Sequence, residues 1–321
     1  MAIRIVATNF LVPETVQTSA EVAALIGKSV EWVQQQSGVN TRHVSAPHED
    51  DPAVFAARAA RPVINKCGPP DLVLYCGVIP RQMLPDTSPF LHRELGLEGT
   101  PCFSVNAACL SFLVALKTAD AFIKANTYRR ILICCAELAS RGRNFDEPES
   151  AALMGDGAAA VMVEADESAV GFEAYRMQSF SEFADLTGVQ GGGTKLPPDH
   201  PDVTHANHQF HMRGDKLLRA TVPRLRRFLS EFLGDHGLTS NDIRLVVPHQ
   251  PSGPGFQLLQ RWGFEDERVV NIVARYGNCV AASMPMALAI AELDGRIQRG
   301  DRILFLGTAA GISIGGGVFQ W

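Results

Sequence analysis

The stretch that decides the fold is SVNAACLSFLVALKT, residues 104–118. It places Cys109 where a run typical of a strand gives way to an apolar segment with helical periodicity. A thiol at a helix N-terminus faces unpaired N–H groups and the positive end of the helix dipole, and both favour the nucleophilic thiolate. The alternative is a small buried core residue, which is the commoner role of a cysteine.

Outward from this junction, segments typical of buried strands alternate with helical segments. This order predicts an α/β fold whose sheets are covered by helices. The helix–strand unit at 106–136 recurs at 277–307, with a small-residue start, an apolar helix, a polar turn and an Arg-Ile-Leu strand. We therefore predict two similar halves, residues 1–165 and 166–321, although two ordinary helix–strand units can also resemble each other by chance.

The composition is that of a globular protein with a large core, with 46% hydrophobic residues and a net charge of −5 over 321 residues. This balance does not indicate binding to nucleic acid or to anionic lipid. The N-terminus reads as a strand rather than a signal peptide, and no apolar run is long enough to span a bilayer. Seven irregularly spaced cysteines without a CxxC pair predict a reducing, cytoplasmic protein without structural zinc.

Two further segments offer partners for Cys109. VVPHQ ends a predicted buried strand at His249, and strand ends carry site residues in layered α/β folds. RYGNCVAAS places Asn278 before a small-residue helix, in a position that we match to Cys109 of the other half. A structural histidine and a simple N-cap are the alternatives. If the halves pack about a pseudo-twofold axis, the three side chains form one site.

Together these motifs resemble beta-ketoacyl-acyl-carrier-protein synthase III and its relatives in the thiolase superfamily, nearly from end to end. The resemblance rests on ordered segments: AACLSF, GDGAAAVMVE, VVPHQ, YGNCVAASMPMALA and GTAAGISIGGGVFQW. It implies a thiolase fold, with two pseudo-symmetric halves in αβαβα layers, and a homodimer. It also implies that Cys109, His249 and Asn278 are the catalytic residues.

The family's chemistry implies an acyltransferase with no cofactor besides its coenzyme A or phosphopantetheine thioester substrates. Cys109 would take an acyl group from acyl-coenzyme A or acyl carrier protein, and the N–H groups of Cys109 and Ala310 would bind the oxyanion. His249 and Asn278 would hold a malonyl-type thioester while it loses carbon dioxide and condenses with the acyl group. Acyl transfer to oxygen or nitrogen is the alternative, and a carrier-binding subunit without activity is a third possibility.

Several positions differ from the family pattern. Trp32 matches a tryptophan that stacks on the coenzyme A adenine, but Gln36 replaces a phosphate-binding arginine, and DEPESAAL lacks a second one. Ser252 replaces an asparagine near the phosphopantetheine arm. Because charge-assisted phosphate contacts are lost, these differences favour a secondary-metabolite (polyketide-type) pathway over fatty-acid initiation, and raise the possibility of a carrier-bound donor.

The segment 215–237 predicts an amphipathic helix that Pro223 should kink or divide. By resemblance, its Arg219 and the later Arg261 match positions that dock the acidic carrier protein, whereas a solvated helix face is the alternative. Three histidines lie at spacings of three in a loop, with no acid or thiol adjacent, so we expect no metal site there. They are His205, His208 and His211.

Overall fold

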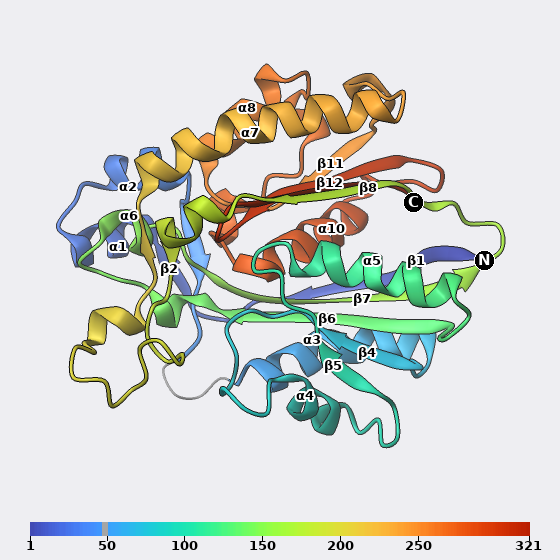
Figure 1. The fold of residues 1–321 in the computed structure, drawn as a ribbon, viewed down its shortest axis with the longest axis horizontal. Helices are drawn as coiled ribbons and strands as arrows, with labels where there is room; N and C mark the ends of the chain where they lie inside the picture. Colours follow the sequence, from blue (N-terminus) through green and yellow to red (C-terminus); the bar gives the residue numbers. More distant parts are fainter. Residues whose placement is uncertain (47–50) are drawn as a thin grey trace.

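The computed structural model describes residues 1–46 and 51–321. Its strands form two main sheets that face each other across a layer of helices (Figure 1). The five-stranded sheet has the order β1-β7-β6-β4-β5, and the four-stranded sheet has the order β11-β12-β13-β8. The first contains β1 Ala2–Leu11, β4 Leu72–Tyr75, β5 Cys102–Ser104, β6 Arg130–Leu138 and β7 Asp156–Asp166; the second contains β8 Gly171–Ser179, β11 Leu245–Pro248, β12 Arg302–Ala309 and β13 Ser313–Gln320.

The two sheets repeat one strand arrangement. In the first, β4 pairs in parallel with β6, which pairs antiparallel with β7. In the second, β11 pairs in parallel with β12, which pairs antiparallel with β13. The sequence of β6, RILICCAEL, is apolar on both faces and is buried from its second residue to its end, as expected for a strand that is covered on both sides.

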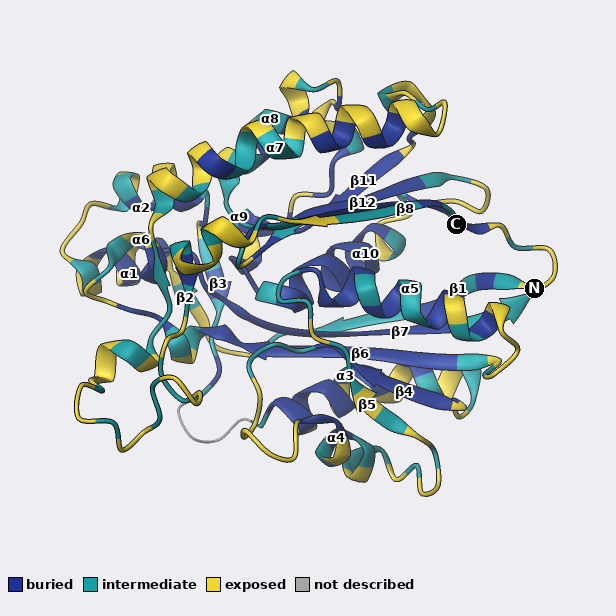
Figure 2. Ribbon diagram, viewed as in Figure 1, coloured by how far each residue is buried: buried dark blue, intermediate teal, exposed yellow. Residues whose placement is uncertain are grey.

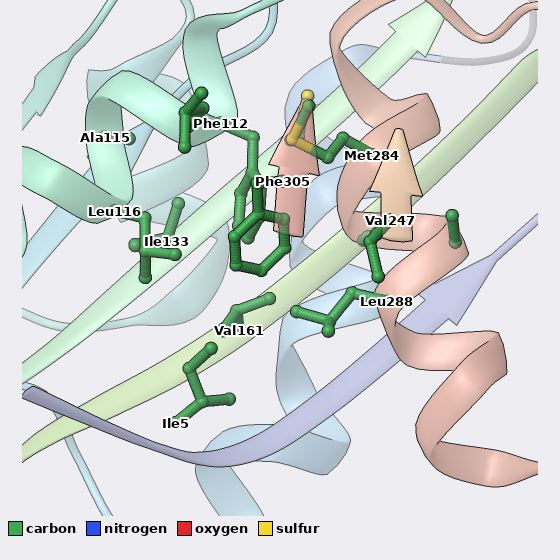
Figure 3. Close-up of a cluster of buried hydrophobic side chains, with 14 of the residues drawn as sticks. Ile5, Phe112, Ala115, Leu116, Ile133, Val161, Val247, Met284, Leu288 and Phe305 are labelled. Atoms are coloured by element: carbon green, nitrogen blue, oxygen red, sulfur yellow. The ribbon is translucent and has the colours of Figure 1, made fainter. Parts of the chain in front are cut away.

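Two helices fill the space between the sheets, α5 (Ser111–Lys124) and α10 (Ser283–Leu293). Figure 2 shows α10 as mostly buried and α5 as buried on one face, and α10 buries nine of its eleven residues. Side chains from both sheets and both helices meet in one core (Figure 3). Within it, Phe112 of α5 contacts Phe305 of β12 edge to face, with ring centroids 6.1 Å apart. The same core therefore holds both halves of the chain together.

The outer layers are α3 (Pro52–Cys67) and α4 (Ser88–Leu95) on the first sheet, and α7 (Gly214–Asp235) and α8 (Gly253–Arg261) on the second. These five layers confirm the predicted αβαβα arrangement. The expected division of α7 at Pro223 is wrong, because the helix continues through it. Pro223 is exposed, so water can bind the carbonyl of Arg219 that its missing N–H leaves without a helical partner.

Small elements gather at one end of the molecule (Figure 1). The segment after Thr18 forms two helices, because Gly27 takes the left-handed conformation and Ser29 caps the second helix. The small elements are β2 Val16–Thr18, α1 Ser19–Ile26, α2 Val30–Ser37, β3 Thr41–His43, α6 Pro148–Ala151, β9 Thr187–Gly188, β10 His211–Met212 and α9 Val273–Tyr276.

The first sheet is drawn from residues 2–166 and the second from residues 171–320. We accordingly propose 1–165 and 166–321 as the two halves of the chain. None of the described helices is long and apolar enough to cross a membrane.

The end of α2 touches the start of α8 through two glycines. A Cβ on Gly253 would lie 2.6 Å from the Cα of Gly38, which is closer than carbon atoms approach. We expect Gly253→Ala to lower the free energy of unfolding by about 1–3 kcal/mol through overpacking, as measured by denaturant titration. Gly234→Ala on α7 is the matched control, because an added Cβ there meets nothing within 4 Å. Equal stability of the two variants would contradict the tight contact.

Candidate active site

Cys109 lies on a tight turn between β5 and α5. The Asn106 side-chain oxygen accepts the Ala108 N–H at 3.0 Å, and the Ser111 hydroxyl accepts the Ala107 N–H at 2.8 Å. Ala108 has a φ of 50°, in the left-handed region that a residue with a Cβ seldom adopts. Such strained turns persist where the surrounding bonds over-determine them, and they cluster at functional sites.

A second turn of the same construction precedes α10. The Asn278 side-chain oxygen accepts the Val280 N–H at 2.8 Å, and the Ser283 hydroxyl accepts the Cys279 N–H at 2.9 Å. Val280 has a φ of 46°, which is a larger strain for a β-branched side chain. Each half of the chain thus contributes one such turn, which we name the Cys109 elbow (residues 106–111) and the Asn278 elbow (residues 278–283).

The two elbows correct the match that we made from sequence. Asn278 corresponds to Asn106, because both accept the N–H two residues later. The residue that corresponds to Cys109 is therefore Ala281, which has no reactive group. Asn278 lies three residues earlier, at the start of its elbow.

His249 follows β11 and is buried, with its backbone N–H bonded to the Leu306 carbonyl at 2.9 Å. Burial lowers the pKa of His249 to about 4, so the ring is neutral at ordinary pH. Its Nδ1 is buried without a hydrogen-bond partner in the described part of the chain. Because a buried N–H without an acceptor is costly, the proton belongs on Nε2, which leaves an N–H donor for a substrate.

The structure brings these segments together. The Ala310 N–H is directed at the Cys109 sulphur. Gly307 lies between His249 and the Cys109 elbow, since a Cβ there would meet the His249 Cβ at 2.8 Å and Leu110 at 3.0 Å. The Asn278 amide donates to the carbonyl of Pro251 at 3.3 Å, which joins its elbow to the segment that follows His249.

The expected thiolate character of Cys109 is wrong for the free protein. Burial, and to a lesser degree the nearby Glu137 carboxylate, raises the pKa of the thiol to about 12. The N–H groups of Ala310 and Cys109 act in the opposite direction but do not prevail. Part of the Cys109 surface remains accessible to solvent, but the surrounding protein removes most of the water that would stabilise a thiolate. Cys109 lies one residue before Leu110, the N-cap of α5.

A cavity of about 50 Å³ lies beside His249, between α7, α8 and the ends of β11 and β12. Its lining is mostly apolar and includes Leu225, Phe256 and Trp262. Trp32 packs in a small cluster with Val33 of α2 and Ala152, just after α6.

The remaining predicted positions lie on other elements, except Ser252, which directly follows Pro251 beside His249 and Asn278. Ser252 precedes α8 and makes no side-chain cap there, while Arg219 and Arg261 are exposed on α7 and α8. His205 and His208 lie in a short 3₁₀ turn, and His211 begins β10. The described residues contain no group of three or more histidine, cysteine or acidic side chains that could hold a metal ion.

Sequence reasoning missed Glu137, which is fully buried on β6 next to the Cys109 site. The available signal was a single acidic residue at the end of an otherwise apolar strand, RILICCAEL. A buried carboxyl group needs hydrogen-bond donors around it, so an acidic residue in such a strand indicates a group of buried donors inside the core.

Five layers that enclose a cysteine elbow define a thiolase-fold acyltransferase. A family model described as 3-Oxoacyl-[acyl-carrier-protein (ACP)] synthase III matches residues 103–180, and the model of its C-terminal part matches 233–321. The chain is 32% identical over 317 residues to the beta-ketoacyl-[acyl-carrier-protein] synthase III of Erythrobacter litoralis, covering 96% of each. It belongs to this family.

Two other relatives agree. The enzyme of the same name from Solibacter usitatus is 28% identical over 326 residues, covering 99% of this chain and 98% of the relative. The crystal structure of 3-oxoacyl-[acyl-carrier-protein] synthase III from Aquifex aeolicus superimposes with a TM-score of 0.89 at 26% identity, covering 99% of this chain and all of that one.

The lowered pKa of His249 predicts a loss of stability in acid. The unfolded chain binds a proton near pH 6.5, whereas the folded ring does so only near pH 4, so stability falls as the pH drops between these values. Relative to His249→Gln, which cannot titrate, the wild type should lose roughly 3 kcal/mol between pH 7 and pH 4. Denaturation at several pH values measures this. His205→Gln, an exposed control, should keep the wild-type slope, and a pH-independent difference for His249→Gln would contradict the burial argument.

Proposed function

We propose that the protein catalyses decarboxylative condensation between an acyl group on Cys109 and a malonyl-type thioester. The observation that carries this proposal is the convergence of a thiol under two backbone N–H groups with two neutral donors, His249 and Asn278. The relatives' shared name, beta-ketoacyl-[acyl-carrier-protein] synthase III, describes the same reaction class.

In the first step the Cys109 sulphur attacks the carbonyl of the donor thioester. A C–S bond to Cys109 forms, the bond to the carrier thiol breaks, and the Cys109 proton ends on the released thiol. The oxyanion of the tetrahedral intermediate accepts the N–H groups of Cys109 and Ala310. Because burial raises the pKa of the thiol to about 12, Cys109 still carries its proton in the free protein when the donor binds.

In the second step the malonyl-type thioester loses carbon dioxide, and the electron pair of the broken C–C bond forms an enolate. Nε2–H of His249 and the amide N–H of Asn278 donate to the enolate oxygen. The enolate carbon attacks the acyl group, Cys109 leaves, and its sulphur takes one proton from solvent. A neutral ring suits this step because an imidazolium would protonate the enolate, and burial keeps His249 neutral.

The second candidate is acyl transfer from Cys109 to an oxygen or nitrogen acceptor. That reaction needs a base to take the acceptor's proton. The lowered pKa makes His249 a weak base, and Asn278 provides no carboxylate to orient it. Both observations favour condensation. The intact set of Cys109, His249 and Asn278 also argues against a carrier-binding subunit without activity.

We further propose a carrier-bound donor and a secondary-metabolite pathway. Lys28 lies 5.5 Å from the Trp32 ring, but Gln36 follows on α2, and α6 carries Pro148 and Glu149 where the family has an arginine. The phosphates of free coenzyme A would thus meet little positive charge. A carrier protein would instead contact the exposed Arg219 and Arg261.

We also propose a cytoplasmic homodimer. All seven cysteines lie among the described residues and are free thiols, which suits a reducing compartment. Strand β5 is an edge strand, and an unpaired edge invites pairing with another chain. Nearby apolar side chains are unusually exposed: Phe103 at 37%, Met83 at 72% and Leu84 at 85%.

Asn278 can be tested by two substitutions. Asn278→Asp keeps the oxygen that accepts the Val280 N–H but replaces the donor amide by an anion, and Asn278→Ala removes both. We expect each to slow carbon dioxide release from a malonyl thioester about 100-fold or more. Acylation of Cys109, followed by intact mass with Cys109→Ala as the blank, should change little. Equal losses in both steps, or an acyl adduct discharged only by alcohols or amines, would contradict condensation.

Carrier docking predicts a charge effect on KM. Arg261→Glu should raise KM for the malonyl carrier protein roughly tenfold through lost electrostatic attraction, with kcat unchanged. KM for a malonyl pantetheine without the protein should stay the same. Arg58→Glu on α3 is the control, because it reverses an exposed charge on the other side of the molecule. The docking surface lies elsewhere if both variants behave like the wild type.

A further inference from the structure

A buried carboxyl group that the proposed reaction does not use lies between the two elbows. Glu137, near the end of β6, is fully buried and accepts the N–H groups of Val78 at 2.7 Å and Ile79 at 3.0 Å. It also accepts the N–H of Ala281, within the Asn278 elbow. No side-chain cation pairs with it in the described part of the chain. Three backbone donors therefore surround one carboxylate.

The repeat of the two halves shows which position of the second half corresponds to Glu137. Arg130 begins β6 as Arg302 begins β12, so that, counting along each strand, Glu137 corresponds to Ala309. The next residue of the second half is Ala310, whose N–H faces the Cys109 sulphur. Ala281 corresponds to Cys109, so the Ala281 N–H in the second half corresponds to the Cys109 N–H, which we propose as an oxyanion donor. The Cys109 N–H faces an open site, whereas the Ala281 N–H faces Glu137.

We propose that Glu137 is a positioning residue whose carboxylate occupies this duplicate oxyanion site and fixes the Asn278 elbow. The inference rests on the proposed function, because it assigns to Glu137 the placement of the amide that would bind the extender. The duplicate site lacks a nucleophile and is filled by a carboxyl group of the chain itself, so only one of the two elbows is left for catalysis.

The Asn278 elbow needs such support. Val280 holds a left-handed φ of 46°, which costs free energy for a β-branched residue and persists only where other bonds enforce it. The bond from the next N–H, that of Ala281, to Glu137 adds such a constraint. Without it, the elbow keeps the Asn278 and Ser283 bonds but loses its tie to the sheet.

Glu137 belongs to the first half of the chain, as do its donors Val78 and Ile79. Val78 and Ile79 lie in the connection that follows β4. Cys76, two residues before Val78, corresponds to His249, because Cys76 donates its N–H to Cys134 of β6 as His249 does to Leu306 of β12. Burial raises the pKa of Glu137 to about 8, against the effect of its three N–H donors. The hydrogen bonds therefore hold the carboxyl group in a place where burial makes its ionised form unfavourable.

Glu137→Ala and Glu137→Gln test the proposal, with Asp120→Asn as control. Asp120 is equally buried but pairs with Lys117 and Lys124 on α5, away from the Asn278 elbow. We expect Glu137→Ala to slow malonyl decarboxylation at least about tenfold while Cys109 acylation changes less than about threefold. Glu137→Gln, which keeps one acceptor oxygen, should lie between Ala and wild type. Formate should partly restore decarboxylation in Glu137→Ala, and Asp120→Asn should keep the wild-type ratio of the two rates.

Amide hydrogen exchange gives a readout that does not depend on activity. In Glu137→Gln, exchange should accelerate in residues 278–283 and stay at the wild-type rate in 106–111. Unchanged exchange in 278–283, or equal losses in acylation and decarboxylation, would overturn the proposal. If the wild type itself releases no carbon dioxide, the proposed condensation fails, and the exchange data still decide whether Glu137 fixes the elbow.

Discussion

The structure depends on burying the starts of two helices, α5 and α10, in the layer between the two sheets. Helices α5 and α10 lie between the sheets, where α10 is almost entirely buried and α5 buries one face. Each begins at an elbow whose polar groups are satisfied locally, by an asparagine oxygen and a serine hydroxyl. The spacing Asn-x-x-x-x-Ser recurs in both halves. At the Asn278 elbow, where the Cys279–Ser283 bond is buried, water cannot replace the serine hydroxyl. The catalytic roles that we propose are built on these two elbows.

Burial also sets the electrostatics of the site. It raises the pKa of Cys109 and lowers that of His249, so both groups are neutral at neutral pH. A neutral thiol, imidazole and amide cost less to desolvate than an ion pair would. Charge then develops only during the reaction, on oxygens that face N–H donors already in place. A site of this kind gains from rigid backbone donors more than from charged side chains.

The layers were predicted from patterns within single segments. That Cys109, His249 and Asn278 lie in neighbouring segments was predicted from the order of motifs along the chain, and their catalytic roles stay a prediction. The sequence alone shows the apolar strands, the helix-periodic run after Cys109 and the order of the motifs. None of these requires knowledge of the tertiary contacts. The match of Asn278 to Cys109 failed because the two residues lie three positions apart within their elbows. That offset is revealed by the hydrogen bonds of Asn106 and Asn278 and by the φ angles of Ala108 and Val280. The thiolate expectation failed because the helix effect is local, whereas desolvation depends on the whole surrounding fold.

Glu137 shows why duplication does not yield two equal sites. Two copies of one elbow in a closed core create two sets of unpaired N–H groups, and each set must find an acceptor. In the Cys109 elbow the acceptor can be a substrate oxygen, because the site opens to solvent. The Asn278 elbow is closed by the first sheet, so its acceptor must come from the chain itself, and Glu137 is the carboxylate within reach. The asymmetry of function then follows from which elbow the fold leaves open.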